Sequence, residues 1–315
     1  MKIFIEIPTW LGDATMATPA IENIVTTYPD AKLTIFGSFI STRLFVHHPN
    51  VEKIIVDESK KKGFRYSNLY QYAKNMGSFD MALSFRRNFT TQFLLFFMDA
   101  KAKYRYRRYT DNEIHQVIRY NDFINRSLAL TTKPSKLKIY TKIDKSAKGR
   151  PLLGINAGAT YGSAKRWYPK EFAACAIELS HKYDIILFGS PAEKEMVDDI
   201  EEIIASNGVD NYQNLAGQTS IEELIEKIAS LELFISNDSG PMHLAAAFGV
   251  PTVAIFGPTR YTETNQWMNK HSIIMTKNLA CAPCMKRTCP LKHHECMKLI
   301  TADMVIDSVK QEGLF

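Results

Sequence analysis

A polar loop between two apolar runs offers a place for an anion to bind. Residues 236–249 read SNDSGPMHLAAAFG. Asp238 or Ser239 is suited to cap a helix that begins here, and Pro241 suits its first turn because proline has no N–H. The remaining N–H groups of such a turn attract anions. The candidate phosphate contacts are Ser239, Gly240 and His243. A second tight turn at 257–259 favours a binding site over the alternative, a capped helix without a ligand.

Several common nucleotide-binding patterns do not occur in the sequence. It contains no GxGxxG fingerprint and no GxxxxGK[ST] phosphate loop. It also contains no Asp-x-Asp pair of the kind that holds a metal-bound sugar nucleotide. These absences speak against a dinucleotide-dependent dehydrogenase, a P-loop NTPase and a metal-dependent transferase.

Cysteines are concentrated near the C-terminus. Four of the five form a C-x2-C-x4-C-x6-C pattern, at Cys281, Cys284, Cys289 and Cys296. Close cysteine pairs in a cytosolic chain favour zinc over disulfides. The spacing is short for a zinc ribbon, so His293 or His294 is a candidate to replace one thiolate. A structural zinc, a reduced thiol cluster and disulfides formed after purification are all open, and none has a catalytic role. The fifth, Cys175, falls in a helical pattern and is expected in a core.

A basic, tyrosine-rich segment reads KAKYRYRR at 101–108. The arginines in and around it are Arg86, Arg87, Arg105, Arg107, Arg108 and Arg119. Guanidinium groups bind carboxylates and phosphates through two parallel hydrogen bonds. Basic residues interleaved with tyrosine also occur where nucleic-acid bases stack, but no nucleic-acid-binding motif accompanies this segment. We therefore expect a ligand that carries carboxylates or phosphates, and no nucleic acid.

Strands alternate with helices in both halves of the sequence. This alternation is what would position the polar loops described above. Short apolar runs predict strands at 2–7, 32–37, 52–56, 80–85, 152–158, 184–189, 211–217, 233–236 and 252–257. Amphipathic stretches predict helices at 14–28, 170–183, 192–206, 220–231 and 241–249. This alternation is typical of an α/β protein with parallel sheets and right-handed crossovers. Ligands of such sheets bind beyond the carboxyl ends of the strands, where the polar loops lie.

Length and charge predict two domains. A chain of 315 residues exceeds a comfortable single core, and a Lys-rich stretch at 131–150 is the expected linker. Residues 1–150 carry a net charge of +12 and residues 151–315 a net charge of −6, although the whole chain carries only +6. The first half is therefore expected to meet a polyanionic partner.

No segment is suited to be a signal peptide or a membrane span. The N-terminal apolar stretch is interrupted by Glu6 and Pro8. The most lipid-like run, FLLFFM at 93–98, is too short to cross a bilayer and is expected in a core. We expect a cytosolic chain, with docking on a membrane surface as an option.

Four ordered stretches resemble the heptosyltransferases of glycosyltransferase family 9, enzymes that build the inner core of lipopolysaccharide. They are 7–21, 156–172, 236–259 and 281–296, the last as in the subfamily resembling heptosyltransferase II. The resemblance covers nearly the whole chain. It implies the GT-B architecture, in which two Rossmann-like domains with parallel sheets face each other across a cleft. The acceptor-binding domain would be 1–145 and the ADP-heptose-binding domain 146–315, with the option that the last helix packs back on the first domain.

The resemblance implies a donor site in the second domain. Its residues would be Thr160, Glu193, Thr219, Asp238, Ser239, Gly240 and His243. Asp238 is expected beside the heptose, Glu193 beside the ribose and Thr219 beside the adenine, whereas the other four contact phosphate. Lys165 would neutralise the charge that develops on departing ADP. Two points stay open: Glu195 is an alternative to Glu193, and some relatives carry consecutive threonines where this chain has Thr160 and a tyrosine.

The resemblance also implies the catalytic base and the acceptor site. Asp13 would take the proton of the acceptor hydroxyl, although a helix N-cap is the alternative role for an aspartate in this position. The acceptor-binding residues would be Trp10, Gly12, Arg86, Arg87, Arg105, Arg107 and Arg108. The acceptor itself would carry Kdo carboxylates and lipid A phosphates, which a basic domain attracts.

These implications together predict an inverting, metal-independent enzyme without a cofactor, most like heptosyltransferase II. It would be a monomer that acts in the cytoplasm, peripherally at the inner membrane. The alternatives are a heptosyltransferase I-like or other family member with a different acceptor, and a catalytically silent nucleotide-sugar-binding protein. A sugar-nucleotide epimerase is disfavoured because it has no use for a basic acceptor surface.

Overall fold

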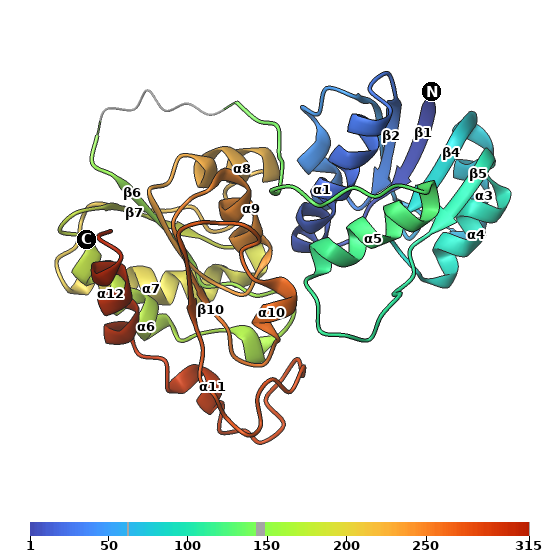
Figure 1. Cartoon of the computed structure of the whole chain (residues 1–315). Coiled ribbons are helices and arrows are strands. Elements are labelled where there is room, and N and C mark those ends of the chain that lie inside the picture. The colour runs from blue at the N-terminus through green and yellow to red at the C-terminus, as the bar shows by residue number, and fades with distance from the viewer. Residues whose placement is uncertain (62, 143–148, 315) are drawn as a thin grey trace. The chain divides into compact units, whose positions relative to one another are not determined.

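The structure is a computed structural model that describes residues 1–61, 63–142 and 149–314 (Figure 1). The chain divides into two units, Met1–Thr141 and Lys142–Phe315. The expected domain boundary between 145 and 146 lies outside the described residues. Each unit is therefore one continuous stretch of chain.

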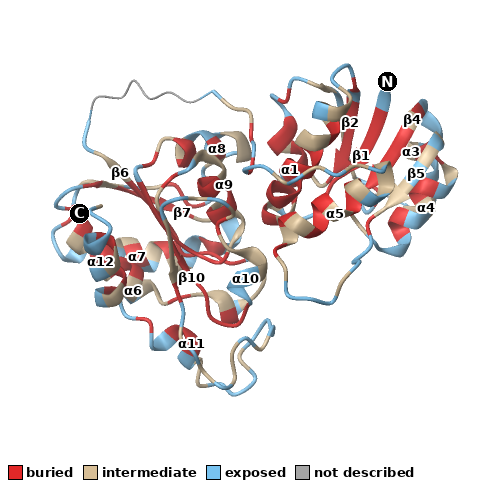
Figure 2. Ribbon diagram, viewed as in Figure 1, coloured by how far each residue is buried: buried red, intermediate tan, exposed pale blue. Residues whose placement is uncertain are grey.

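Unit 1 contains a parallel sheet of five strands in the order β3-β2-β1-β4-β5. The strands are β1 (Lys2–Glu6), β2 (Lys32–Gly37), β3 (Val51–Val56), β4 (Ser78–Ser84) and β5 (Asp99–Arg105). The helices are α1 (Leu11–Thr27), α2 (Phe39–Thr42), α3 (Arg65–Asn75), α4 (Phe89–Phe97) and α5 (Gln116–Leu128), with a 3₁₀ turn η1 (Arg43–Phe45). Strands β1 and β2 are buried on both faces, which is why they read as almost continuous apolar runs (Figure 2).

Unit 2 contains a parallel sheet of six strands in the order β11-β10-β9-β6-β7-β8. The strands are β6 (Leu152–Asn156), β7 (Asp184–Phe188), β8 (Tyr212–Asn214), β9 (Leu233–Asn237), β10 (Thr252–Ile255) and β11 (Ser272–Met275). The helices are α6 (Pro169–Leu179), α7 (Lys194–Ser206), α8 (Ile221–Ala229), α9 (Gly240–Phe248), α10 (Tyr261–Thr264), α11 (Glu295–Lys298) and α12 (Ala302–Gln311). Two 3₁₀ turns, η2 (Ser163–Lys165) and η3 (Pro191–Glu193), follow β6 and β7.

Both sheets have the strand order of a Rossmann-like doubly wound fold, which confirms the α/β prediction. The order changes direction next to the first strand of each unit, so that β1 lies between β2 and β4, and β6 lies between β7 and β9. Ligands of doubly wound sheets bind at this switch point, outside the carboxyl ends of the two central strands. The loops after β1 and β4, and those after β6 and β9, are therefore the first places to look for a site.

The last helix, α12, packs against α6 within unit 2. Val305 and Val309 are fully buried in the unit 2 core, and the Lys310 ammonium lies 2.8 Å from the Glu178 carboxylate on α6. The apolar face of α12 is thus already covered by its own unit. The option that this helix also packs on the first domain stays a prediction.

Other differences from the sequence-based expectations are local. Helix α1 begins at Leu11 instead of residue 14, and α3, β5 and α5 were not predicted. The prediction that FLLFFM packs in a core holds for Leu94 and Leu95 but is wrong for Phe96, which is 74% exposed. Within the described ranges, no helix combines the length and apolar character needed to cross a membrane.

Candidate active site

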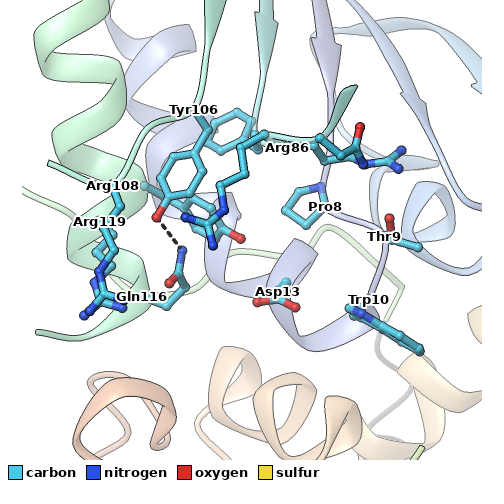
Figure 3. A pocket seen from close by; sticks show the side chains of 13 residues that line it. Pro8, Thr9, Trp10, Asp13, Arg86, Tyr106, Arg108, Gln116 and Arg119 are labelled. Atoms are coloured by element: carbon cyan, nitrogen blue, oxygen red, sulfur yellow. Dashed lines mark hydrogen bonds between the residues drawn. The ribbon is translucent and has the colours of Figure 1, made fainter. Parts of the chain in front are cut away.

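A pocket of about 520 Å³ lies in unit 1 at the carboxyl ends of β1, β4 and β5 (Figure 3). Five predicted site residues line it: Trp10, Asp13, Arg86, Arg87 and Arg108. Arg119, which was predicted as part of the basic segment, lines it too, and so do Tyr106, Gln116 and Tyr120, which were given no role. The pocket therefore combines one carboxylate with four arginines, and it lies at the switch point of the sheet.

Asp13 is held in this pocket by the first turn of α1. The N-cap of that helix is Trp10, which makes no side-chain capping hydrogen bond, so the alternative role of Asp13 as N-cap is wrong. The nearby Tyr120 is buried, and its pKa is raised well above the usual value, first by burial and then by the negative charge of Asp13. A protonated phenol and a carboxylate thus lie close together in the pocket.

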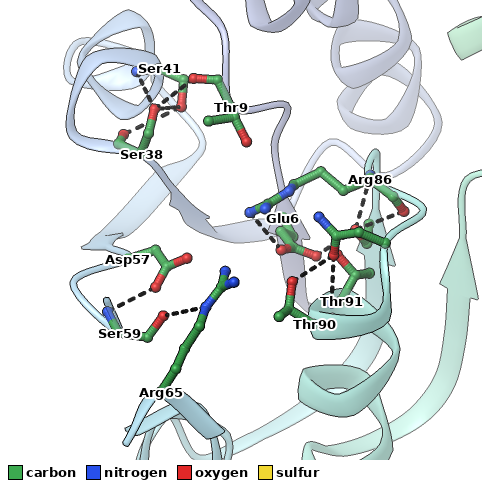
Figure 4. A network of polar contacts seen from close by, with 12 residues as sticks. Glu6, Thr9, Ser38, Ser41, Asp57, Ser59, Arg65, Arg86, Thr90 and Thr91 are labelled. Atoms are coloured by element: carbon green, nitrogen blue, oxygen red, sulfur yellow. Dashed lines mark hydrogen bonds and ion pairs between the residues drawn. The ribbon is translucent and has the colours of Figure 1, made fainter. Parts of the chain in front are cut away.

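Arg86 is fixed by a buried carboxylate (Figure 4). Its Nη1 lies 3.1 Å from Glu6 Oε1, and Ser84 Oγ donates to Glu6 Oε2 at 2.5 Å. Glu6 is only 2% exposed, and burial raises its pKa while the positive charge of Arg86 opposes that shift. The guanidinium is therefore held in one orientation at the pocket wall.

Two more arginines are oriented by backbone carbonyls. Arg119, which is 7% exposed, donates from Nη2 to the carbonyl of Asn112 at 3.0 Å. Arg108 donates from Nε to the carbonyl of Thr110 at 3.0 Å. Arg108 Nε also lies 4.0 Å from the exposed Asp111 carboxylate. Both guanidinium groups are thus held by the segment that follows β5, at the wall of the pocket.

Three predicted acceptor residues are not brought into the pocket. Gly12 is buried in the first turn of α1, and Arg105 donates from Nη1 to Gln92 Oε1 on α4 at 3.0 Å. Arg107 is exposed. The pocket lining includes none of these three described residues. Alternation along an extended segment explains the pattern, since Tyr106 and Arg108 point to the pocket side.

Unit 2 has a buried ion pair at its own switch point. Lys165 Nζ, from η2 after β6, lies 2.5 Å from Asp238 Oδ2 after β9. Thr259 Oγ1, after β10, donates to the same oxygen at 2.5 Å. The two charged side chains are 12% and 4% exposed. Three strand-end loops are thus tied together at one carboxylate, which fixes the position of Lys165.

Amide side chains join the same loops. Asn237 Oδ1 accepts from the Trp167 N–H at 3.0 Å, and Asn237 Nδ2 donates to the Ala157 carbonyl at 2.6 Å. Asn156 Nδ2 donates to Ser239 Oγ at 3.3 Å. Neighbouring strands β6 and β9 end together, so side chains about 80 positions apart in sequence meet here. These bonds make the loop geometry rigid before any ligand binds.

Ser239, one of the two expected alternatives, is the N-cap residue of α9, but its side chain makes no capping hydrogen bond. Its hydroxyl lies 3.0 Å from Ser236 Oγ instead. Gly240 and Pro241 are the first two helical residues, and His243 is 3% exposed. The N-terminal N–H groups of α9 are therefore not satisfied by the N-cap side chain, as an anion-binding helix end requires.

The remaining donor candidates also follow strands of the unit 2 sheet. Glu193 is 8% exposed, and its Oε2 accepts from the Ser190 N–H at 2.9 Å and the Ser190 hydroxyl at 2.8 Å. Its carboxylate occupies the space in which Gly158 would carry a Cβ. Glu195, the alternative, is exposed on α7. Thr219 is half-buried before α8, and Thr160 is exposed after β6.

The cysteine-bearing segment, 281–296, packs on the loop that carries Lys165. Ala164 N–H donates to the Arg287 carbonyl at 3.0 Å, and Tyr161 hydroxyl donates to the Met285 carbonyl at 2.8 Å. In this packing, Lys165 Nζ lies 4.8 Å from the centroid of the Tyr161 ring. No role was predicted for Tyr161 or Arg287, because contacts between segments so far apart in sequence leave no local pattern.

The cysteines themselves are not disulfide-bonded. Within the part of the chain that the structure describes, no three His, Cys, Asp or Glu side chains are placed to share a metal ion. Cys281 Sγ lies 4.0 Å from His293 Nε2, and burial raises the pKa of Cys296 to about 11. Cys175 is fully buried, as predicted. Metal analysis and thiol titration of the purified protein would distinguish the three alternatives for the other four: a structural zinc, reduced thiols, and disulfides formed after purification.

Comparison with known proteins identifies the family. Residues 84–295 match Glycosyltransferase family 9 (heptosyltransferase). The chain is 41% identical to lipooligosaccharide heptosyltransferase 2 of Campylobacter jejuni, over 98% of either protein. It has the fold of Escherichia coli ADP-heptose LPS heptosyltransferase II, with a TM-score of 0.81 at 22% identity over 100% of this chain and 99% of that one. It also has the fold of E. coli heptosyltransferase WaaC with ADP, with a TM-score of 0.79 at 15% identity over 99% and 100%. These likenesses confirm the GT-B class, and the chain belongs to glycosyltransferase family 9, the heptosyltransferases.

Proposed function

We propose that this enzyme transfers heptose from ADP-L-glycero-D-manno-heptose to the heptose/Kdo inner core of lipopolysaccharide or lipooligosaccharide, as a heptosyltransferase II-like member of its family. The observation that carries the proposal is the 41% identity with a lipooligosaccharide heptosyltransferase 2 along almost the whole chain. The solved relative with bound ADP supports an ADP-linked donor.

The first chemical role belongs to Asp13. Its carboxylate takes the proton of the acceptor hydroxyl as that oxygen attacks the anomeric carbon of the heptose. Attack opposite the bond to ADP inverts the anomeric centre. The pocket supports this role because it places a carboxylate among arginines that suit an acidic sugar. Arg86, Arg108 and Arg119 are the candidates to bind the Kdo carboxylates and phosphates of the acceptor.

The second role belongs to Lys165 and the N-terminus of α9. When the bond between the anomeric carbon and the ADP oxygen breaks, negative charge develops on the diphosphate. Lys165 is held by Asp238, the N–H of Gly240 opens a helix without a side-chain cap, and the His243 side chain follows one turn in. The ammonium, the helix end and the imidazole stabilise the departing ADP, and we propose that no metal ion is required. Glu193 and Thr219 then bind the ribose and the adenine.

The enzyme would work as a monomer in the cytoplasm, peripherally at the inner membrane, because its acceptor is anchored in lipid. The basic character of residues 1–150 supports an anionic acceptor at that surface.

Transfer is tested by incubating the protein with ADP-heptose and either Kdo-lipid A or heptosyl-Kdo-lipid A. ADP release and product mass are followed together. We expect release that depends on the heptosyl acceptor, and a product heavier by one heptose. Release with Kdo-lipid A alone would indicate a heptosyltransferase I-like acceptor. Binding of ADP-heptose without acceptor-dependent release would identify a catalytically silent binding protein.

A further inference from the structure

Helices α3 and α4 carry a continuous row of aromatic rings on the surface of unit 1. We define this aromatic row as Phe64, Tyr66, Phe89, Phe93, Phe96 and Phe97. Ring centroids are 5.6 Å apart between Phe64 and Tyr66, 5.9 Å between Tyr66 and Phe89, and 5.0 Å between Tyr66 and Phe93. They are 4.8 Å apart between Phe93 and Phe97, and 4.9 Å between Phe96 and Phe97.

The outer rings of this row are open to solvent. Phe64 is 72% exposed, Phe89 is 66% exposed and Phe96 is 74% exposed. The core-facing side of the same helices is already packed, since Leu69 and Leu94 are buried in the unit 1 core. Tyr66, Phe93 and Phe97 pack against that core, so the apolar surface that the fold of unit 1 leaves open consists of the Phe64, Phe89 and Phe96 rings. Apolar surface of this kind marks an interaction site in a water-exposed protein.

Two lysines lie near the aromatic row, one of them next to Tyr70, whose ring centroid is 5.1 Å from that of Phe97. Lys103 Nζ donates to the Phe96 carbonyl at 3.3 Å, and Lys74 Nζ lies 5.7 Å from the ring centroid of Tyr70 on α3. Together α3, α4 and β5 contain five basic residues and a single acidic one, Asp99. An anionic surface complements these basic residues. A second copy of the chain would instead bring a second set of positive charges against the first.

We propose that the aromatic row docks unit 1 on an anionic membrane surface. Exposed phenylalanine rings enter the boundary between headgroups and acyl chains, and the flanking lysines contact the anionic headgroups. Two weak interactions of this kind, one apolar and one electrostatic, together give reversible binding to the membrane.

The aromatic row also adjoins the pocket that contains Asp13. Asn88 lines that pocket and caps α4, accepting from the Thr91 N–H at 2.9 Å, and Phe89 is the next residue. A membrane-docked row would thus place the pocket beside lipid-anchored sugars. This consequence, unlike the docking itself, rests on the proposed function.

Vesicle binding tests the proposal directly. Wild-type protein is mixed with vesicles of phosphatidylcholine alone, or of phosphatidylcholine with phosphatidylglycerol, and the bound fraction is measured by sedimentation. We expect binding to the mixed vesicles that weakens with salt. The F64S/F96S variant should lose affinity by about tenfold or more, since both rings leave water on docking. K74Q/K103Q should lose both affinity for mixed vesicles and salt sensitivity.

The matched control is L291S/L299S, which removes two exposed leucines of unit 2, 58% and 46% exposed. It should bind vesicles like the wild type, and unfolding curves should show that all variants are folded. Equal vesicle binding by wild type and F64S/F96S would overturn the proposal. So would a wild-type dimer that F64S/F96S converts to monomer, because the row would then be a contact between copies.

Turnover on a water-soluble, acyl-free heptosyl-Kdo acceptor separates docking from catalysis. F64S/F96S should keep its kcat there and lose rate only on the lipid acceptor in vesicles. Wild-type protein that binds vesicles through the row but transfers no heptose would refute the proposed function and leave the docking intact. Heptose transfer without vesicle binding would refute the docking and leave the proposed function intact.

Discussion

Asp13 combines two positions that rarely suit one carboxylate, a helix first turn and a pocket wall. Asp13 lies in the first turn of α1, at the positive end of the helix dipole, and the pocket that it lines also contains four arginines. Its proposed role as the base is tested by a single substitution.

Replacing Asp13 with asparagine should leave the pocket shape intact and remove the proton acceptor. We expect kcat to fall by about 10²- to 10⁴-fold, the range for loss of a general base. The affinity for ADP-heptose, measured by calorimetry, should not change. Asp30→Asn, at an exposed position, is the control. A kcat near that of the wild type would remove Asp13 from this role.

The buried pair of Glu6 and Arg86 predicts a pH-dependent stability. The pKa of Glu6 is raised above its usual 4.5, so its contribution to stability is fully present below 4.5 and is lost as the pH rises through the folded pKa. Arg86 limits this loss by lowering the pKa. In Arg86→Met, the free energy of unfolding should therefore fall more steeply between about pH 5 and about pH 8 than in the wild type.

Urea denaturation at the two pH values measures this difference. Adding Glu6→Gln to the Arg86→Met variant removes the titrating group, and the extra pH dependence should disappear. If the double variant kept it, Glu6 would not be its source.

Lys165 pairs with Asp238 and also has a proposed catalytic role. Two variants can separate its effect on stability from its effect on turnover. Lys165→Met leaves the buried Asp238 unpaired, so unfolding free energy should fall by about 3–5 kcal/mol. Lys165→Met with Asp238→Asn should recover most of that stability, as measured by denaturation, but none of the turnover. Recovery of turnover together with stability would reduce Lys165 to a structural residue.

At the scale of elements, the turn after β6 and the turn after β7 fit into each other. The absent side chain of Gly158 makes room for the Glu193 carboxylate, which in turn accepts two hydrogen bonds from Ser190 at the start of η3. The ribose-binding candidate is thus positioned by a turn on a different strand.

Gly158→Ala should push this carboxylate away and weaken ADP binding. We expect the dissociation constant of ADP to rise by about tenfold, in line with a misplaced hydrogen-bonding group. Gly149→Ala, whose Cβ would meet open space, is the matched control. Unchanged ADP affinity in a folded Gly158→Ala protein would argue against Glu193 as a donor contact.

Sequence patterns predicted the elements better than the contacts between them. Alternating apolar runs and helices indicated the sheet of each unit, because those signals are local. The buried Glu6 was noticed only as an interruption of a strand, and its partner Arg86 lies 80 positions away. The link from Lys165 to Asp238 depends on β6 and β9 being neighbours, which no pattern within either segment reveals. Ser239 is the N-cap residue of α9, but its hydroxyl contacts Ser236 instead of the first turn, and no pattern within 236–249 reveals that contact.

At the scale of the whole molecule, charge is divided unevenly along the chain, with +12 in residues 1–150 and −6 in the remainder. An anionic acceptor is drawn to the first part by a field that salt screens within about 8–10 Å at physiological ionic strength. Raising the salt concentration should therefore increase KM for the acceptor more than KM for ADP-heptose. Steady-state kinetics over a salt series measures both, and a larger effect on the donor would contradict the assignment of the acceptor to unit 1.

Each unit is one uninterrupted stretch of chain, and this affects how the protein is made. All five strands of the first sheet have been synthesised once Arg105 has been added, and the helix α5 that completes the unit ends at Leu128. Unit 1 can therefore fold while unit 2 is still being translated. The exposed aromatic row would then be formed on the nascent chain, where it is available to chaperones or lipid before unit 2 is complete.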